Sequence, residues 1–282
     1  MKRNRFGVAA LVAATMTLTA CGIDPVEPKP WPSSSPTAEV NAAAAESSAP
    51  APKRFEWADV TGQGVALPRD VRENTQYSAE PIPGAKILHA SSGEFMNGCT
   101  IGPAVVGTGA QGLGFLTSGA CARGATPLQY LQTLPGGGIQ PWAEASGPGS
   151  VSVIWSARSA PGVTRIAGTW PIAGVLTAEG AYQLVREGAP VCINGATSGV
   201  RCWSRPDPQG QLALDLPGSG QDTGAPAFVV DRATGHAVLL GIYRRGVGVE
   251  FLDSILTDAK VLLDPSVKPL TGANFFELVE VR

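Results

Sequence analysis

The amino-acid sequence predicts an all-β fold for the part of the chain expected to fold, residues 58–282. Three observations support this prediction. The chain is rich in turn-forming residues, with 35 Gly and 24 Pro, its apolar residues come in short runs between these turns, and few segments show a helical period. Many short strands with little helix are typical of a β-sandwich or β-barrel. Runs of strand length occur at Val151–Trp155, Arg165–Trp170, Gln211–Leu216, Ala227–Val230 and Ala237–Tyr243.

Helical spacing of apolar residues is clearest near the C-terminal end. In Phe251–Leu263, Phe251, Ile255 and the apolar residues that follow recur at helical spacing, which predicts a short C-terminal helix. Ala178–Glu187 is compatible with a helix or a strand. The length of the folding part, with a core expected over residues 85–265, fits one large domain or two small barrels.

The first 20 residues have the pattern of an export signal. A basic start with Lys2, Arg3 and Arg5 precedes an apolar segment, Phe6–Met16, that is too short to span a bilayer. It leads into Leu18–Cys21, which resembles the lipobox of bacterial lipoproteins, where the cysteine thiol accepts a lipid. The resemblance implies a chain held through Cys21 at the extracytoplasmic side of the cell membrane, because acyl chains partition into the bilayer. The alternative is an ordinary signal peptide with a chance cysteine.

Residues 21–57 are dominated by Pro, Ala and Ser, with few large apolar residues to bury. Such a segment cannot offset the entropy of ordering, so it is predicted to be a tether between membrane and domain. Without the three basic residues of the signal, 18 of the 21 Lys and Arg residues remain against 23 Asp and Glu. A net negative charge gives no support to nucleic-acid binding.

Four cysteines remain if Cys21 carries lipid. An even number outside the cytoplasm favours two disulfides, and three pairings are open from the residues alone. Zinc is the competing interpretation, but the spacings are wide and contain no Cys-x-x-Cys. We therefore expect neither a metal nor a cofactor. The four residues are Cys99, Cys121, Cys192 and Cys202.

Three motifs occur in the order found in trypsin-like serine proteases of the streptogrisin and α-lytic branch. Gly114–Cys121 (GFLTSGAC), after Cys99–Gly102, resembles the strand that ends in the catalytic histidine and a cysteine. Val191–Cys202 (VCINGATSGVRC) resembles a cysteine-bounded hairpin of that branch. Gln221–Pro226 (QDTGAP) stands in the place of the nucleophile turn, G-D-S-G-G-P. The resemblance implies two six-stranded antiparallel β-barrels with a cleft between them, and disulfides that join Cys99 to Cys121 and Cys192 to Cys202.

The same resemblance places the catalytic positions at residues that cannot perform the chemistry. Acyl transfer requires a nucleophile, a base within hydrogen-bond reach and a carboxylate that orients the base. The base position is Ala120 and the nucleophile position is Thr223. Between Cys121 and Cys202 there is no Asp, and the acids there, Glu144, Glu179 and Glu187, do not fit the family pattern. We therefore expect no enzymatic activity.

The turn around Thr223 departs further from the family pattern. Asp222 is present, but the arginine that the resemblance pairs with it is replaced by Ile193, so either another arginine, Arg201 or Arg186, reaches Asp222 or the turn is not held in the active shape. Gln221 and Ala225 replace glycines, which lowers the tolerance of the turn for positive φ angles.

The predicted function is therefore binding by an inactive protease fold. The cleft of such a fold binds extended peptides along the strand aligned with Gly241–Arg244, so a peptide or protein partner is expected there. One alternative is a residual hydrolase that uses Thr223, and another is a structural module of the cell envelope with a closed cleft. The candidate cleft residues are Gln221, Asp222, Thr223, Gly241, Ile242 and Tyr243.

Overall fold

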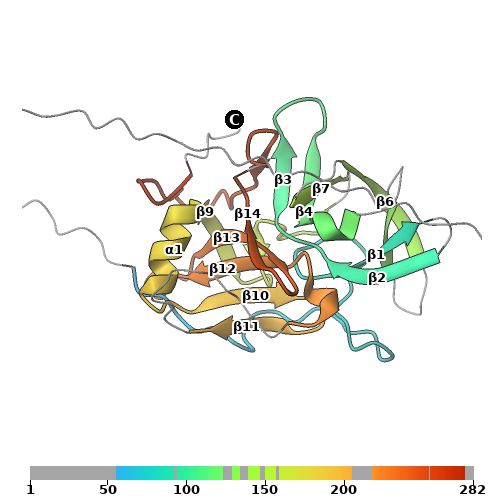
Figure 1. The fold of residues 1–282 in the computed structure, drawn as a ribbon, viewed down its shortest axis with the longest axis horizontal. Helices are drawn as coiled ribbons and strands as arrows, with labels where there is room; N and C mark the ends of the chain where they lie inside the picture. Colours follow the sequence, from blue (N-terminus) through green and yellow to red (C-terminus); the bar gives the residue numbers. More distant parts are fainter. Residues whose placement is uncertain are drawn as a thin grey trace, which may run out of the picture. The chain divides into compact units, whose positions relative to one another are not determined.

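Two curled β-sheets make up the computed structural model, which describes residues 55–91, 94–122, 129–133, 139–146, 150–156, 159–204, 218–253 and 255–276 (Figure 1). The first sheet has the order β15-β3-β4-β7-β6-β5-β1-β2. All its pairings are antiparallel. The all-β prediction is confirmed. The strands of this sheet are β1 (Lys86–Ser91), β2 (Glu94–Thr100), β3 (Ala104–Gly107), β4 (Leu113–Ser118), β5 (Gln129–Thr133), β6 (Ile139–Ser146), β7 (Val151–Trp155) and β15 (Ala259–Val261).

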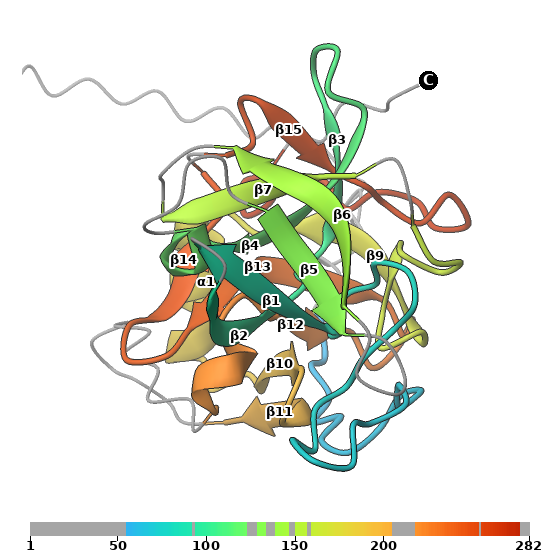
Figure 2. The same ribbon diagram turned by 90° about the vertical axis from the view of Figure 1, so that its right-hand side faces the viewer.

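The first sheet closes on itself through a bend between β2 and β3. These strands lie far apart in the sheet order, yet only residues 101–103 connect them. From Thr100 to Ala104 the chain makes four Cα–Cα steps, which span about 14 Å at most, so the two ends of the sheet must lie close together. The link also pairs on both sides, because Ile101 N donates to Ala85 O and Gly102 N donates to Leu116 O. With β2 and β3 counted as a single bent strand, six strands form the barrel, and β15 is added at its edge (Figure 2).

The second sheet has the order β11-β10-β12-β13-β9-β8, and β14 also pairs with β13. Its pairings are antiparallel except for β9 with β13, where Ile172 lies opposite Ala237 in parallel register. The predicted strand Gln211–Leu216 lies outside the described residues. The strands are β8 (Arg165–Ile166), β9 (Trp170–Val175), β10 (Val191–Gly195), β11 (Gly199–Trp203), β12 (Pro226–Val230), β13 (Ala237–Arg244) and β14 (Gly248–Phe251).

The helix lies elsewhere than predicted. Phe251–Leu263 is not a helix, because its start belongs to β14 and its later part contains β15. Only a turn separates the two strands, with Ile255 N and Leu256 N both bonded to Leu252 O. The α-helix of the described chain is α1 (Ala178–Arg186), which begins where the Thr177 hydroxyl caps Gly180 N. No helix among the described residues is long and apolar enough to cross a membrane.

Three apolar clusters hold the sheets together. One lies inside the first barrel around Ile87, Phe115 and Ile154, and one packs α1 against the second sheet. The third contains residues of both sheets, among them Leu116 of β4 and Phe228 of β12, so the two sheets share a core. Burial of this shared surface is the main force that fixes one sheet against the other.

The N-terminal segment covers the second sheet before it enters the first. Trp57 bridges to Asp231, and Phe55 stacks on Trp57 and meets Phe275 edge-on. Ordered packing therefore begins ahead of the predicted boundary at residue 58. Further along, backbone amides of this segment bond to strands of the second sheet and to the turns that follow β8 and β10. These bonds are Ala58 N to Val230 O, Gly62 N to Val200 O, Val65 N to Ala167 O and Gln76 N to Ala196 O.

The buried carboxylate of Asp264 fastens the C-terminal segment to β8. Burial alone would raise the pKa of this carboxyl, but hydrogen bonds from Ser266 and Thr164 and the nearby charge of Arg165 outweigh it and lower the pKa overall. The ionised carboxylate thus joins two chain segments about 100 residues apart in sequence.

Candidate functional site

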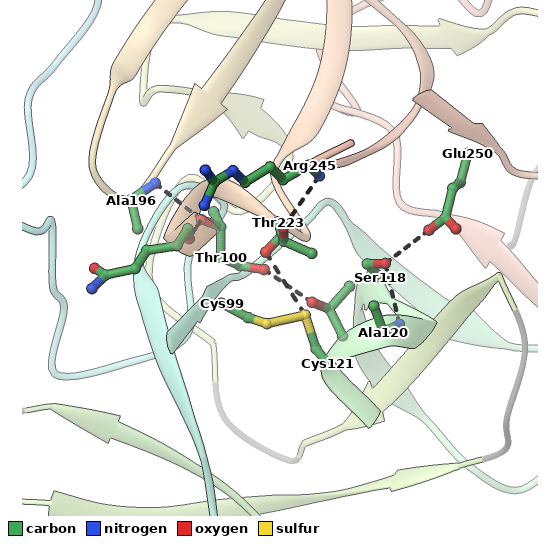
Figure 3. The surroundings of a disulfide bond; sticks show 11 residues. Cys99, Thr100, Ser118, Ala120, Cys121, Ala196, Thr223, Arg245 and Glu250 are labelled. Atoms are coloured by element: carbon green, nitrogen blue, oxygen red, sulfur yellow. Dashed lines mark hydrogen bonds between the residues drawn. A yellow bond between two sulfur atoms is a disulfide. The ribbon is translucent and has the colours of Figure 1, made fainter. Parts of the chain in front are cut away.

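The positions that the family resemblance assigns to base and nucleophile meet at the junction of the two sheets (Figure 3). Ala120 lies in a short 3₁₀ turn, η1 (Gly119–Ala122), that follows β4, and Thr223 follows a second such turn, η2 (Gly220–Asp222). Thr100 N donates to Thr223 O at 2.7 Å, and Cys121 Sγ lies 3.8 Å from the same oxygen. Segments about 100 residues apart in sequence thus form one site.

Both predicted disulfides are confirmed. Cys99 is bonded to Cys121, and Cys192 is bonded to Cys202. The first joins β2 to η1 and so fixes the turn that carries Ala120 beside Thr223. The second joins β10 to β11, whose cysteines lie directly opposite each other in the register. Each bridge constrains the unfolded chain as well as the folded one.

A glycine allows the Thr223 turn to press against the first sheet. Gly224 has a φ of 98°, and a Cβ added there would lie 2.3 Å from both Thr100 O and Thr117 Oγ1. Glycine is the residue that adopts this backbone conformation without strain. Thr100 completes the contact, because its hydroxyl donates to Gln221 O at 2.7 Å and accepts from Ala196 N at 3.0 Å.

The polar groups of Thr223 are used inside the fold. Its hydroxyl accepts a hydrogen bond from Arg245 N at 3.3 Å, and its amide donates to Gly220 O at 3.3 Å. The residue is only 8% exposed. An oxyanion site needs backbone N–H groups that converge on an external oxygen. The amide of Thr223, which follows η2, instead donates to Gly220 O, a carbonyl of that turn.

Asp222 is completely buried and supports the same turn. Its carboxylate accepts hydrogen bonds from Thr197 N at 2.8 Å, Ser198 N at 3.1 Å, Ser198 Oγ at 2.5 Å and Ser219 N at 2.6 Å. Of the two alternatives drawn from the sequence, an arginine partner is not what the structure shows, because neither Arg201 nor Arg186 is among these donors and Arg186 pairs with Glu179. A hairpin turn between β10 and β11 supplies the donors that an arginine was expected to supply. This partner depends on tertiary structure, so no local pattern in the sequence could have indicated it.

The strand expected to bind a peptide has no open edge at Gly241–Tyr243. Gly241 and Ile242 pair with β12 on one side and with β14 on the other. Tyr243 exchanges backbone bonds with Gly224 and Ala225 and also lies opposite Val249. All three residues are buried. This part of the strand thus has no free edge to which a peptide could add, and five of the six candidate cleft residues are buried, all but Gln221.

One acidic side chain at the site was not predicted. Glu250 of β14 is 7% exposed and accepts a hydrogen bond from Ser118 Oγ at 2.8 Å, while Ala120 N donates to the same hydroxyl at 3.3 Å. Arg244 pairs with the other carboxylate oxygen at 3.0 Å. The family resemblance implies a carboxylate between the motifs of the base and the nucleophile, but Glu250 follows both of them in the sequence. Glu250 follows the buried Val249 in a strand, and nothing in this local sequence indicated that its carboxylate would belong to the site.

A histidine base or a metal site would need further side chains near Thr223, and among the described residues the structure shows none that serve either purpose. His236 lies in the turn between β12 and β13, where its amide bonds to Thr234 Oγ1. The side chain of His89 lies outside the described residues. Within the part of the chain that the structure describes, no three His, Cys, Asp or Glu side chains form a group suited to a metal ion.

Comparisons with known proteins show similarity at the level of structure only. No protein-family model matches the sequence, and no curated protein matches it. Among solved structures, the chain resembles a glutamic acid specific serine protease that utilizes a novel histidine triad in substrate binding. The two share 15% sequence identity, with a TM-score of 0.35, over 63% of this chain and 96% of the other.

Proposed function

We propose that this protein is a catalytically inactive domain of the trypsin-like serine protease fold, held by a lipid at the outer face of the cell membrane. The observation that carries the proposal is the state of Thr223. Its hydroxyl and its amide both bond within the fold, and the residue in the base position is Ala120. A hydroxyl with no base to accept its proton is a weak nucleophile at neutral pH.

A role in binding or in cell-envelope structure follows from this proposal. A peptide or protein partner remains the proposed ligand, but we do not assign its contact to Gly241–Tyr243, because both edges of that strand are already paired. This observation favours a module with a closed cleft, whose outer surface makes the contacts. The alternative of a residual hydrolase would require Thr223 to be activated, and it is tested directly below.

The purified domain is expected to show no hydrolysis of ester or peptide substrates above buffer, and no labelling of Thr223 by a fluorophosphonate probe. Working triads lose most of their rate acceleration when a single member is removed, and here base and serine are both replaced. Mass spectrometry of the probe-treated protein and fluorogenic assays measure this. Thr223→Ala is the matched variant. Hydrolysis by the natural protein that disappears in Thr223→Ala would show that the domain is an enzyme.

Anchoring is expected to depend on Cys21. Replacement by Ser removes the thiol that would accept the lipid, so Cys21→Ser should move the protein from the membrane fraction to the soluble fraction. The acyl chains contribute about 0.8 kcal/mol per buried CH₂, so their loss should be decisive. Fractionation followed by immunoblotting measures the change, with Ser34→Ala in the predicted tether as a control that should keep its location. Membrane association that survives in Cys21→Ser contradicts the lipid anchor.

A further inference from the structure

The disulfide between Cys192 and Cys202 lies at one end of the second sheet. Among the strands that the structure describes, β11 is the last of this sheet and pairs with β10 alone (Figure 1). Cys202 of β11 is partly exposed, whereas Cys192 of β10 is fully buried. We propose that this bridge is a redox switch, which a dithiol reductant opens at Cys202 and which, once open, loosens the turn that holds Asp222.

The two disulfides differ in how far a reductant can reach them. Thiol–disulfide exchange requires a thiolate to approach one of the sulfurs, so its rate depends on access. Cys99 and Cys121 are only 6% and 4% exposed and belong to the apolar cluster of the first barrel. A reductant therefore reaches them only when part of that barrel opens. Cys202 lies in an edge strand, so the second bridge should be reduced first.

The contacts that cover Cys202 come from a short stretch of the N-terminal segment. Val60 N donates to Cys202 Sγ at 3.3 Å, and Cys202 N donates to the Thr61 hydroxyl at 2.9 Å. Gly62 N donates to Val200 O in the same strand. Thr61 and Gly62 are exposed, so separation of this stretch from β11 uncovers little apolar surface. Local opening of such a contact requires much less free energy than unfolding of the domain.

The bridge belongs to the hairpin whose turn supports the candidate site. Residues 196–198 connect β10 to β11, and Thr197 N, Ser198 N and Ser198 Oγ donate to the Asp222 carboxylate. β10 is also paired with β12, but β11 has no second strand beside it among the described residues. Without the bridge, only packing and hydrogen bonds hold β11 in place. Because Ser198 directly precedes β11, movement of this strand weakens the support of Asp222.

The reductant supplies the electrons and protons of the switch. A thiolate of the dithiol attacks Cys202 Sγ, the S–S bond breaks, and Cys192 leaves as a thiolate that takes up a proton. The second thiol of the reductant then displaces Cys202 from the mixed disulfide. The protein gains two electrons and two protons, and the dithiol becomes a disulfide.

Reduction of the natural protein in its folded state tests the order of opening. The protein is incubated with dithiothreitol, free thiols are trapped with iodoacetamide at intervals, and each cysteine is quantified by mass spectrometry of its peptide. The pair Cys99 and Cys121 is the matched control in the same molecule. We expect Cys192 and Cys202 to be alkylated at least about tenfold faster than this pair. Equal rates, earlier opening of the first bridge, or no reduction of either bridge would overturn the proposal.

Hydrogen exchange tests whether opening reaches the site. After selective reduction, the amides of Thr197 and Ser198 should exchange at least about tenfold faster, because they donate to Asp222 from the loosened turn. The amide of Gly102, which donates to Leu116 O in the first sheet, should not change. Reoxidation should restore the protection.

Unchanged protection of Thr197 and Ser198 would show a reducible bridge that does not act on the site, and would overturn the switch. Faster exchange at Gly102 as well would show general unfolding and would overturn it too. Neither measurement uses hydrolysis or membrane association, so failure of the switch is distinguishable from failure of the proposed function.

Discussion

Replacement of Gly224 by alanine is expected to destabilise the domain by about 3–5 kcal/mol, which is a large part of the stability of an ordinary domain. The new Cβ would lie 2.3 Å from Thr100 O and from Thr117 Oγ1, in a turn with a φ of 98°. Thr100 cannot withdraw freely, because its backbone and hydroxyl bond to Thr223 and Gln221. Overpacking and backbone strain therefore add. Urea unfolding followed by tryptophan fluorescence measures the loss.

Gly235→Ala is the matched control. Gly235 also has a positive φ, 68°, but a Cβ there would meet nothing within 4 Å. Only the conformational cost remains, about 1 kcal/mol. Equal losses in the two variants would mean that backbone conformation alone sets the cost, and that the turn does not press on β2 and β4 as described.

Replacement of Asp222 by asparagine is expected to cost about 2–4 kcal/mol. The carboxylate accepts from three backbone amides and one hydroxyl in a completely buried position. Asparagine preserves the shape but presents an NH₂ group to at least one of these donors. Two donors would then face each other without water. Thermal unfolding at neutral pH measures the change in the free energy of unfolding.

An exposed aspartate provides the comparison for Asp222. Asp59 accepts one hydrogen bond, from Thr61 N at 2.9 Å, at the surface. Asp59→Asn should change the stability by no more than about 0.5 kcal/mol. A loss in Asp222→Asn no larger than this would show that the hairpin between β10 and β11 does not depend on the carboxylate.

Local pattern was sufficient for much of the fold. β7, β12 and β13 lie where apolar runs between turn residues predicted strands, because buried strands of both sheets are nearly continuous in apolar residues. The same criterion failed at Phe251–Leu263. There, apolar residues of β14, of the turn after it and of β15 recur at helical spacing although they do not form a helix. Pairing with β13 and β3 determines their conformation, and these partners lie far away in sequence.

The candidate site, too, could be predicted from the sequence only in part. The family resemblance correctly indicated which cysteines would pair, and the first pair brings the turn of Ala120 next to Thr223, because Cys121 Sγ lies 3.8 Å from Thr223 O. It could not indicate that Ser198 would serve Asp222, or that Glu250 would arrive from β14, because both contacts depend on how the hairpins pack. A strand with a free edge and a strand paired on both edges likewise have the same sequence pattern. The burial of Tyr243 could therefore be recognised only from the structure.

The contact between Phe55 and Phe275 has a consequence for the evolution of the gene. Their ring centroids are 5.9 Å apart, so the first and the last segments that the structure describes lie side by side. A domain of this kind can be inserted into a surface loop of another protein, or have its ends joined and new ends opened elsewhere, without distortion of its sheets.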